Sequence, residues 1–152
     1  MAINKSKFWN EALETAPREV LEANQLKDLQ EIVKFAYDNS PYYKRSFDEA
    51  GVKPSDIKTL KDIEKFPFIN KKTQRDTQGV GSFLGELCAV PEDDVVFIST
   101  SSGSTGVPTI SPFTQKDFDE FQDTEARWFW QVGVRPNDRY VHALNFSLYV
   151  GG

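Results

Sequence analysis

The chain has 152 residues, with 18 Lys and Arg against 23 Asp and Glu, so its formal net charge at pH 7 is -5. A single cysteine excludes a disulfide-stapled scaffold. No apolar run approaches the ~20 residues of a membrane helix, and the acidic balance argues against broad nucleic-acid binding. Residues 1–14 are polar and contain no apolar signal region. We therefore expect a cytoplasmic protein without membrane or nucleic-acid partners.

Residues 1–90 have the pattern of short helices joined by turns. The dipeptide Ser40-Pro41 should end the first long helix, because the residue before proline avoids the α region. Gly51 suits the left-handed position that follows a helix, and Thr59 suits a cap that precedes one. Helices are predicted at four places in this segment: residues 25–37, 42–50, 60–65 and one turn after Asn70.

Residues 91–152 have a different pattern. The apolar run 95–98 predicts a buried strand, and residues 110–113 predict a second strand. Thr114 should cap a helix, with Asp117 at capping-box distance, and that helix should end at Gly133. Its apolar stripe would comprise Phe118, Phe121, Trp128, Phe129 and Val132. Residues 140–144 predict a third strand.

These patterns predict an α/β protein with two parts. Residues 1–90 would form an amino-terminal helical segment. Residues 91–152 would form the start of a larger mixed sheet domain, because three buried strands need more cover than this chain offers. The fold would be incomplete as it stands.

The chemistry is concentrated in residues 99–109, which read Ser-Thr-Ser-Ser-Gly-Ser-Thr-Gly-Val-Pro-Thr. Glycines allow positive φ and close backbone approach, and successive N–H groups in such a turn form a cavity for an anion. No lysine is present, so this is not a Walker loop, and Gly79-Val80-Gly81 lacks the third glycine of a dinucleotide fingerprint. On composition alone, a phosphate-binding loop and a flexible Ser/Gly linker both remain open.

Residues 101–109 resemble the phosphate-binding signature of the adenylate-forming enzymes, roughly [ST]SG[ST]TGxPK. Thr109 replaces the final lysine, as is usual in the phenylacetate–coenzyme A ligase branch, and Val107 stands where that branch often has lysine. Further segments resemble the amino-terminal portion of that branch in the same order: Phe8-Trp9-Asn10, Pro17-Arg18-Glu19, Gln25-Leu26, Pro41-Tyr42-Tyr43, Phe47, Ala50-Gly51-Val52, Phe66-Pro67-Phe68, residues 133–138 and residues 148–152. The resemblance covers nearly the whole chain.

The resemblance implies an AMP-forming acid–thiol ligase. Such an enzyme activates a carboxylic acid with ATP and Mg²⁺ as an acyl-adenylate, then transfers the acyl group to coenzyme A. An aryl acid such as phenylacetate is the expected substrate, and the complete protein could form a homodimer. The residues expected to bind the ATP phosphates are Ser101, Ser102, Gly103, Ser104, Thr105, Gly106 and Thr109.

The remaining machinery is expected elsewhere. Phe146 and Tyr149 would lie near the acyl pocket, although ordinary core packing is the alternative for both. The catalytic residues would lie beyond residue 152, and no metal ligands are expected in this chain. Two other functions stay open: an adenylyl-transferring relative with a different acceptor, and a non-catalytic nucleotide-binding fragment.

Overall fold

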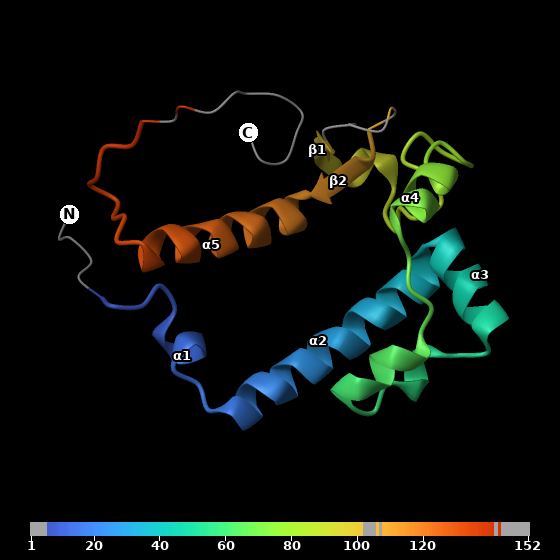
Figure 1. Cartoon of the computed structure of the whole chain (residues 1–152), viewed down its shortest axis with the longest axis horizontal. Coiled ribbons are helices and arrows are strands. Elements are labelled where there is room, and N and C mark those ends of the chain that lie inside the picture. The colour runs from blue at the N-terminus through green and yellow to red at the C-terminus, as the bar shows by residue number, and fades with distance from the viewer. Residues whose placement is uncertain (1–5, 102–105, 107, 142, 144–152) are drawn as a thin grey trace.

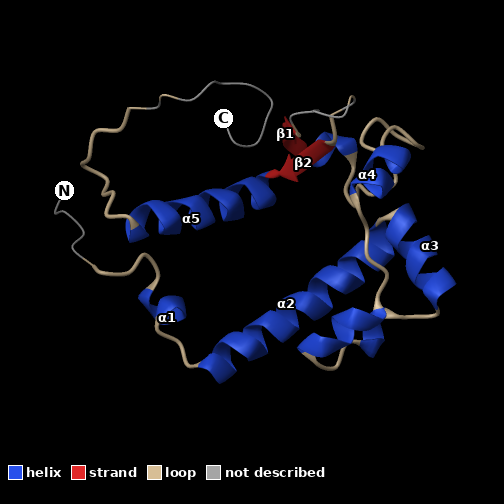
Figure 2. Cartoon of the chain, viewed as in Figure 1, coloured by secondary structure: helices blue, strands red, loops and turns tan. Residues whose placement is uncertain are grey.

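The computed structural model describes residues 6–101, 106, 108–141 and 143. This part of the chain is rich in helices and contains one small antiparallel sheet (Figures 1 and 2). The α-helices are α1 Glu11–Glu14, α2 Arg18–Asn39, α3 Pro41–Ala50, α4 Lys71–Thr77 and α5 Gln115–Gln131. The 3-10 helices are η1 Pro54–Asp56, η2 Leu60–Lys65 and η3 Glu92–Asp94, and the strands are β1 Val95–Thr100 and β2 Ile110–Thr114.

A buried cluster, which we call the helical core, joins α2 and α3 to the two 3-10 helices that follow. It consists of Val33, Phe47, Ile57 and Phe66, each at most 6% exposed. The rings of Phe47 and Phe66 meet edge to face at 4.9 Å between centroids, a geometry that adds to the apolar burial. This first part of the chain therefore encloses a core of its own.

The ends of these helices follow from their caps. The Ser40 side chain accepts from the Tyr43 N–H at the start of α3, and Gly51 ends that helix with φ +69°. The long helix α2 begins directly after Pro17. It is longer than the predicted 25–37, because the apolar spacing begins only at Leu26 while the first exposed turns carry no such pattern. Residues 60–65 form a 3-10 helix after Thr59, and Asn70 caps α4 as predicted.

The hairpin pairs Ile98 with Pro112 and Thr100 with Ile110. After β2, Thr114 and Asp117 form the predicted capping box of α5: the Thr114 hydroxyl donates to Asp117 Oδ2 at 2.7 Å, and the Asp117 N–H donates to Thr114 Oγ1 at 3.2 Å. The sequence therefore located this strand-to-helix junction correctly.

Two predictions about the strands are wrong within the described residues. The strand β1 exists but is not buried, since Val96 is 55% exposed and Phe97 is 46% exposed. Tyr140, Val141 and Ala143 lie in no strand, and residues 142 and 144 lie outside the described part. A strand forms only where a neighbour takes up its hydrogen bonds, and the described sheet contains β1 and β2 alone.

The described residues before α1 pack against α5, although more than a hundred residues separate the two in the chain. The Trp130 indole N–H donates to the Ser6 carbonyl oxygen at 3.2 Å, and the Trp9 indole N–H donates to Asp123 at 2.7 Å. The rings of Trp9 and Trp130 lie 5.5 Å apart. Trp130, outside the predicted apolar stripe, is thus the buried residue of α5, whereas Trp128 is 59% exposed.

None of the described helices is both long and apolar enough to cross a membrane. The predicted boundary at residue 90 stays a prediction.

Candidate functional site

The Ser/Thr/Gly segment connects β1 to β2, so the hairpin brings its two ends together. Ser101 follows β1, and Thr109 precedes β2. The Ser101 N–H donates to the Thr109 carbonyl oxygen, and the Thr109 N–H donates to the Ser101 hydroxyl oxygen. The donor–acceptor distance is 3.0 Å in both hydrogen bonds. Thr109 is buried. These two predicted phosphate-binding residues therefore form the closed base of the loop.

The other predicted residues are placed less fully. Gly106 is exposed and has φ +115°, a backbone conformation that L side chains rarely adopt. Ser102, Gly103, Ser104 and Thr105 lie outside the described residues, as do Phe146 and Tyr149. The phosphate-binding and acyl-pocket assignments thus stay predictions.

Gln78, directly after α4, forms hydrogen bonds to the loop base on the side away from β1. This residue was not predicted from the sequence. Its Nε2 donates to the Pro108 carbonyl oxygen at 3.2 Å, and its Oε1 accepts from the Ile110 N–H at 2.8 Å. These two backbone groups flank Thr109 and point away from β1. The glutamine side chain thus takes the place that the peptide group of a third strand would have. Nothing in the local spacing of Gln78 signals this contact with a segment thirty residues later.

A tight turn after α4 fixes the position of Gln78. The Glu86 N–H donates to the Thr77 carbonyl oxygen at 3.3 Å, which closes the segment 77–86 on itself. Gly85 has φ +81°, and a Cβ there would lie 2.3 Å from the same carbonyl oxygen. Only glycine fits this close approach.

Glu86 ties the turn to the junction of α2 and α3. Its carbonyl oxygen accepts from the Ser40 hydroxyl at 2.8 Å and from the Tyr42 N–H at 3.1 Å. Its carboxylate receives two hydrogen bonds from the Arg45 guanidinium, at 3.1 and 2.8 Å. This pairing lowers the pKa of the Glu86 carboxyl below its ordinary value. The loop base is therefore connected through Gln78 and Glu86 to the helical core.

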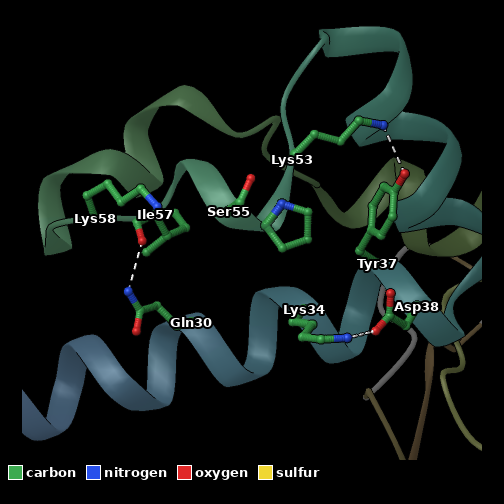
Figure 3. Close-up of a pocket in the computed structure, with 9 residues that line it drawn as sticks. Gln30, Lys34, Tyr37, Asp38, Lys53, Ser55, Ile57 and Lys58 are labelled. Atoms are coloured by element: carbon green, nitrogen blue, oxygen red, sulfur yellow. Dashed lines mark hydrogen bonds and ion pairs between the residues drawn. The ribbon is translucent and has the colours of Figure 1, made fainter.

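A separate pocket of about 570 Å³ lies between α2 and η1, on the other side of the helical core (Figure 3). Two of the three lysines that line it have acidic partners: Lys34 pairs with Asp38, and Lys53 pairs with Asp48 and contacts the Tyr37 hydroxyl at 2.9 Å. The Asp48 carboxylate and the tyrosine hydroxyl raise the pKa of Lys53. Carboxylates thus offset the charges of Lys34 and Lys53, which leaves Lys58 as the remaining lysine of the lining.

No family model matches the chain. Among curated proteins, it is 40% identical over 140 residues to the phenylacetate–coenzyme A ligase of Escherichia coli, a match that covers 92% of this chain and 31% of the relative. It is 38% identical over 145 residues to the ligase of the same name from Thermus thermophilus, with 95% and 32% covered. The chain thus spans about a third of the length of these curated relatives.

The solved structures that resemble the chain are also those of a coenzyme A ligase. The fold superposes with a TM-score of 0.89 on 2-hydroxyisobutyryl-CoA ligase in complex with 2-HIB-AMP, at 30% identity over 99% of this chain and 31% of that one. A complex of the same ligase with 2-HIB-AMP and CoA gives a TM-score of 0.82, with 91% of this chain and 29% of that chain covered. The chain is related to the amino-terminal portion of the phenylacetate–coenzyme A ligases, as its motifs indicated.

Proposed function

We propose that this chain is the amino-terminal part of an ATP-dependent, AMP-forming acid–coenzyme A ligase. One observation carries most of the weight: 99% of the chain superposes on a ligase whose structure holds an acyl-adenylate. The curated relatives, at 38% to 40% identity, support the same reaction class.

The reaction has two steps. A carboxylate oxygen attacks the α-phosphorus of ATP and displaces pyrophosphate, which gives an acyl-adenylate. The thiol of coenzyme A then attacks the acyl carbonyl and displaces AMP, which gives a thioester. Charge builds up on the leaving pyrophosphate in the first step, so donors that are fixed in advance around it lower the barrier.

The chain would contribute the loop from Ser101 to Thr109 to the first step. Its backbone N–H groups and hydroxyls, with Gly103 and Gly106 allowing close approach, would hold the phosphates. Mg²⁺ would offset part of the triphosphate charge. The described residues contain no group of three or more His, Cys, Asp or Glu that could hold a metal ion, so the protein ligands of Mg²⁺ are expected elsewhere, with the catalytic residues.

The division of the chain forms part of the proposal. Residues 1–90 would be the helical amino-terminal segment, and residues 91–152 the first strands, phosphate loop and helix of the large domain. Phe146 and Tyr149, which follow α5 in the sequence, would contribute to the acyl pocket.

Two carboxylic acids are candidates for the substrate. The curated relatives are named for phenylacetate, whereas the solved ligase carries the adenylate of 2-hydroxyisobutyrate. We propose an aryl acid, because the relatives with the higher identity act on one by name. The test incubates the full-length protein that contains this chain with Mg·ATP, CoA and either acid, and measures thioester by mass spectrometry.

Thioester from phenylacetate and not from 2-hydroxyisobutyrate supports the proposal. AMP release without a CoA thioester would indicate a relative with another acceptor, and ATP binding without turnover would indicate a nucleotide-binding protein. The 152-residue chain alone should show no acid-dependent pyrophosphate exchange.

The loop assignment has its own test. Gly103→Val in the full-length protein should weaken ATP binding while the fold is retained, because a β-branched residue resists positive φ and blocks close approach. Unchanged ATP affinity in the folded variant would contradict the assignment.

A further inference from the structure

We propose that Gln78 is a positioning residue for ATP: its side chain fixes the exit of the phosphate loop and thereby sets the efficiency with which the enzyme uses Mg·ATP. The inference rests on the proposed function, and it assigns a role to a residue outside the loop signature. The geometry that carries it is the pair of hydrogen bonds from one amide to Pro108 and Ile110.

The two hydrogen bonds act on the last residue of the signature from both sides. Thr109 is tied to Ser101 on its β1 side by two hydrogen bonds, one between backbone groups and one from its N–H to the Ser101 hydroxyl oxygen. Gln78 holds the preceding carbonyl and the following N–H on the opposite side. The backbone around Thr109 is therefore held on both sides. The two ends of the loop, at Ser101 and Thr109, are thus kept at a fixed separation.

A fixed base matters because ordering a binding segment on contact with its ligand reduces the free energy of binding. Each backbone residue that becomes ordered costs roughly 1–2 kcal/mol, so a loop whose ends are already set binds its ligand with a smaller loss. Gln78 is itself held in place, because the turn at Gly85 and the bonds of Glu86 anchor α4 to the helical core.

A neutral side-chain amide suits the chemistry of this position. One side chain must donate to a carbonyl and accept from an N–H at once, which Asn and Gln do and Lys does not. Asn is one methylene shorter. A carboxylate could accept from Ile110, but when ionised it would repel both the Pro108 oxygen and a nearby triphosphate. Glutamine satisfies both backbone groups without adding a charge near the loop.

The experiment compares Gln78→Met, which keeps the length and loses both hydrogen bonds, with Gln74→Met in the full-length protein. Gln74 lies one turn earlier on α4, is exposed and lines the same hollow, but the hydrogen bonds to Pro108 and Ile110 come from Gln78 and not from Gln74. For Gln78→Met we expect kcat/KM for Mg·ATP to fall about tenfold, the effect of losing roughly one good hydrogen bond. KM for the acid should stay within about twofold, and Gln74→Met should resemble the wild type.

Hydrogen exchange of peptides that span residues 108–114 provides a readout independent of catalysis. Gln78→Met should speed exchange of the Ile110 amide. Gln78→Glu, which keeps the acceptor for that amide and serves if the Met variant does not fold, should exchange slowly there and still use ATP poorly.

Wild-type efficiency with ATP in either folded Gln78 variant would overturn the proposal, as would equal changes in the KM of ATP and of the acid. Failure of the ligase proposal gives a different result. The wild type itself would then make no thioester, while the exchange of Ile110 would still report whether the contact exists.

Discussion

The helical core and the region formed by β1, β2 and α5 are both rich in aromatic side chains, but they bury them differently. Phe47 and Phe66 are each 4% exposed and contact each other. In the second region, Phe97 lies 5.8 Å from Phe113, centroid to centroid, and yet is 46% exposed. Phe121 is 42% exposed. Aromatic contacts alone therefore do not make a core; cover from several elements does.

The difference arises from the number of elements that meet. The helical core lies among α2, α3, η1 and η2, and the last three elements each contact α2. The hairpin and α5 contact each other in two layers, and an open hollow of about 1140 Å³ lies between α2 and α5. We expect the helical core to dominate the stability of the described chain.

The largest expected effect follows from truncating the centre of the helical core. Phe47→Ala should lower the free energy of unfolding by about 3–5 kcal/mol, the range for buried aromatic residues. Phe121→Ala, which truncates a half-exposed ring on α5, should cost about 1 kcal/mol or less. Urea titrations followed by far-ultraviolet circular dichroism measure both.

Tryptophan fluorescence sharpens this comparison, because the three tryptophans Trp9, Trp128 and Trp130 all lie on the amino-terminal segment or α5. If the two regions unfold together, Phe47→Ala shifts the fluorescence and dichroism midpoints equally. Equal losses for Phe47→Ala and Phe121→Ala would contradict the ranking of the two regions.

Local patterns in the sequence predicted the features that depend on neighbours in the chain. Leu26, Leu29 and Val33 follow helical spacing, and they mark the face of α2 that packs on the helical core. Thr114 and Asp117 predicted the start of α5 because both partners of a capping box lie within one turn. The hydroxyl-rich segment was recognised from its composition and from its resemblance to a known signature.

Features that join distant segments were not predictable in this way. Gln78 reaches Pro108 from the turn that Gly85 closes after α4, and Trp130 is covered in part by Ser6 and Trp9 from the other end of the chain. The exposure of β1 was missed for the same reason. An apolar run shows that a strand can be buried, but the elements that would cover it are set by tertiary contacts.

The second prediction concerns the turn that connects the two regions. Gly85→Ala should destabilise the chain by about 2–4 kcal/mol, because positive φ is costly for alanine and its Cβ would collide with the Thr77 carbonyl oxygen. Gly81→Ala is the matched control. Gly81 has φ +75° with open space around it, so only the conformational cost of about 1–2 kcal/mol applies.

The same pair of variants tests whether the turn fixes the position of Gln78. Hydrogen exchange at Ile110 should become faster in Gly85→Ala and change little in Gly81→Ala. Equal destabilisation by the two substitutions would show that the close approach between Gly85 and Thr77 does not matter.

The smallest expected effect depends on pH and lies in the helical region. Asp62 accepts from Lys65 Nζ at 2.7 Å and from the backbone N–H groups of Lys58 and Thr59 at 2.9 and 2.7 Å. The lysine first, and then the backbone donors, lower the pKa of this carboxyl well below its usual range. The folded state therefore favours the carboxylate. Its stabilisation is complete above the unfolded pKa of about 3.9 and is lost as the pH falls below that value.

Asp62→Asn should accordingly be less stable than the wild type at pH 7 and should lose less stability between about pH 5 and pH 2. Lys65→Met removes the largest cause of the shift and keeps the backbone donors, so its pH dependence should fall between the two. Thermal melts at several pH values provide the measurement. Because Asp62 belongs to the helical region and the tryptophans to α5 and the segment that contacts it, circular dichroism should detect the acid transition at a higher pH than fluorescence if the two regions unfold separately. Parallel pH curves for Asp62→Asn and the wild type would show that this carboxylate does not contribute to acid unfolding.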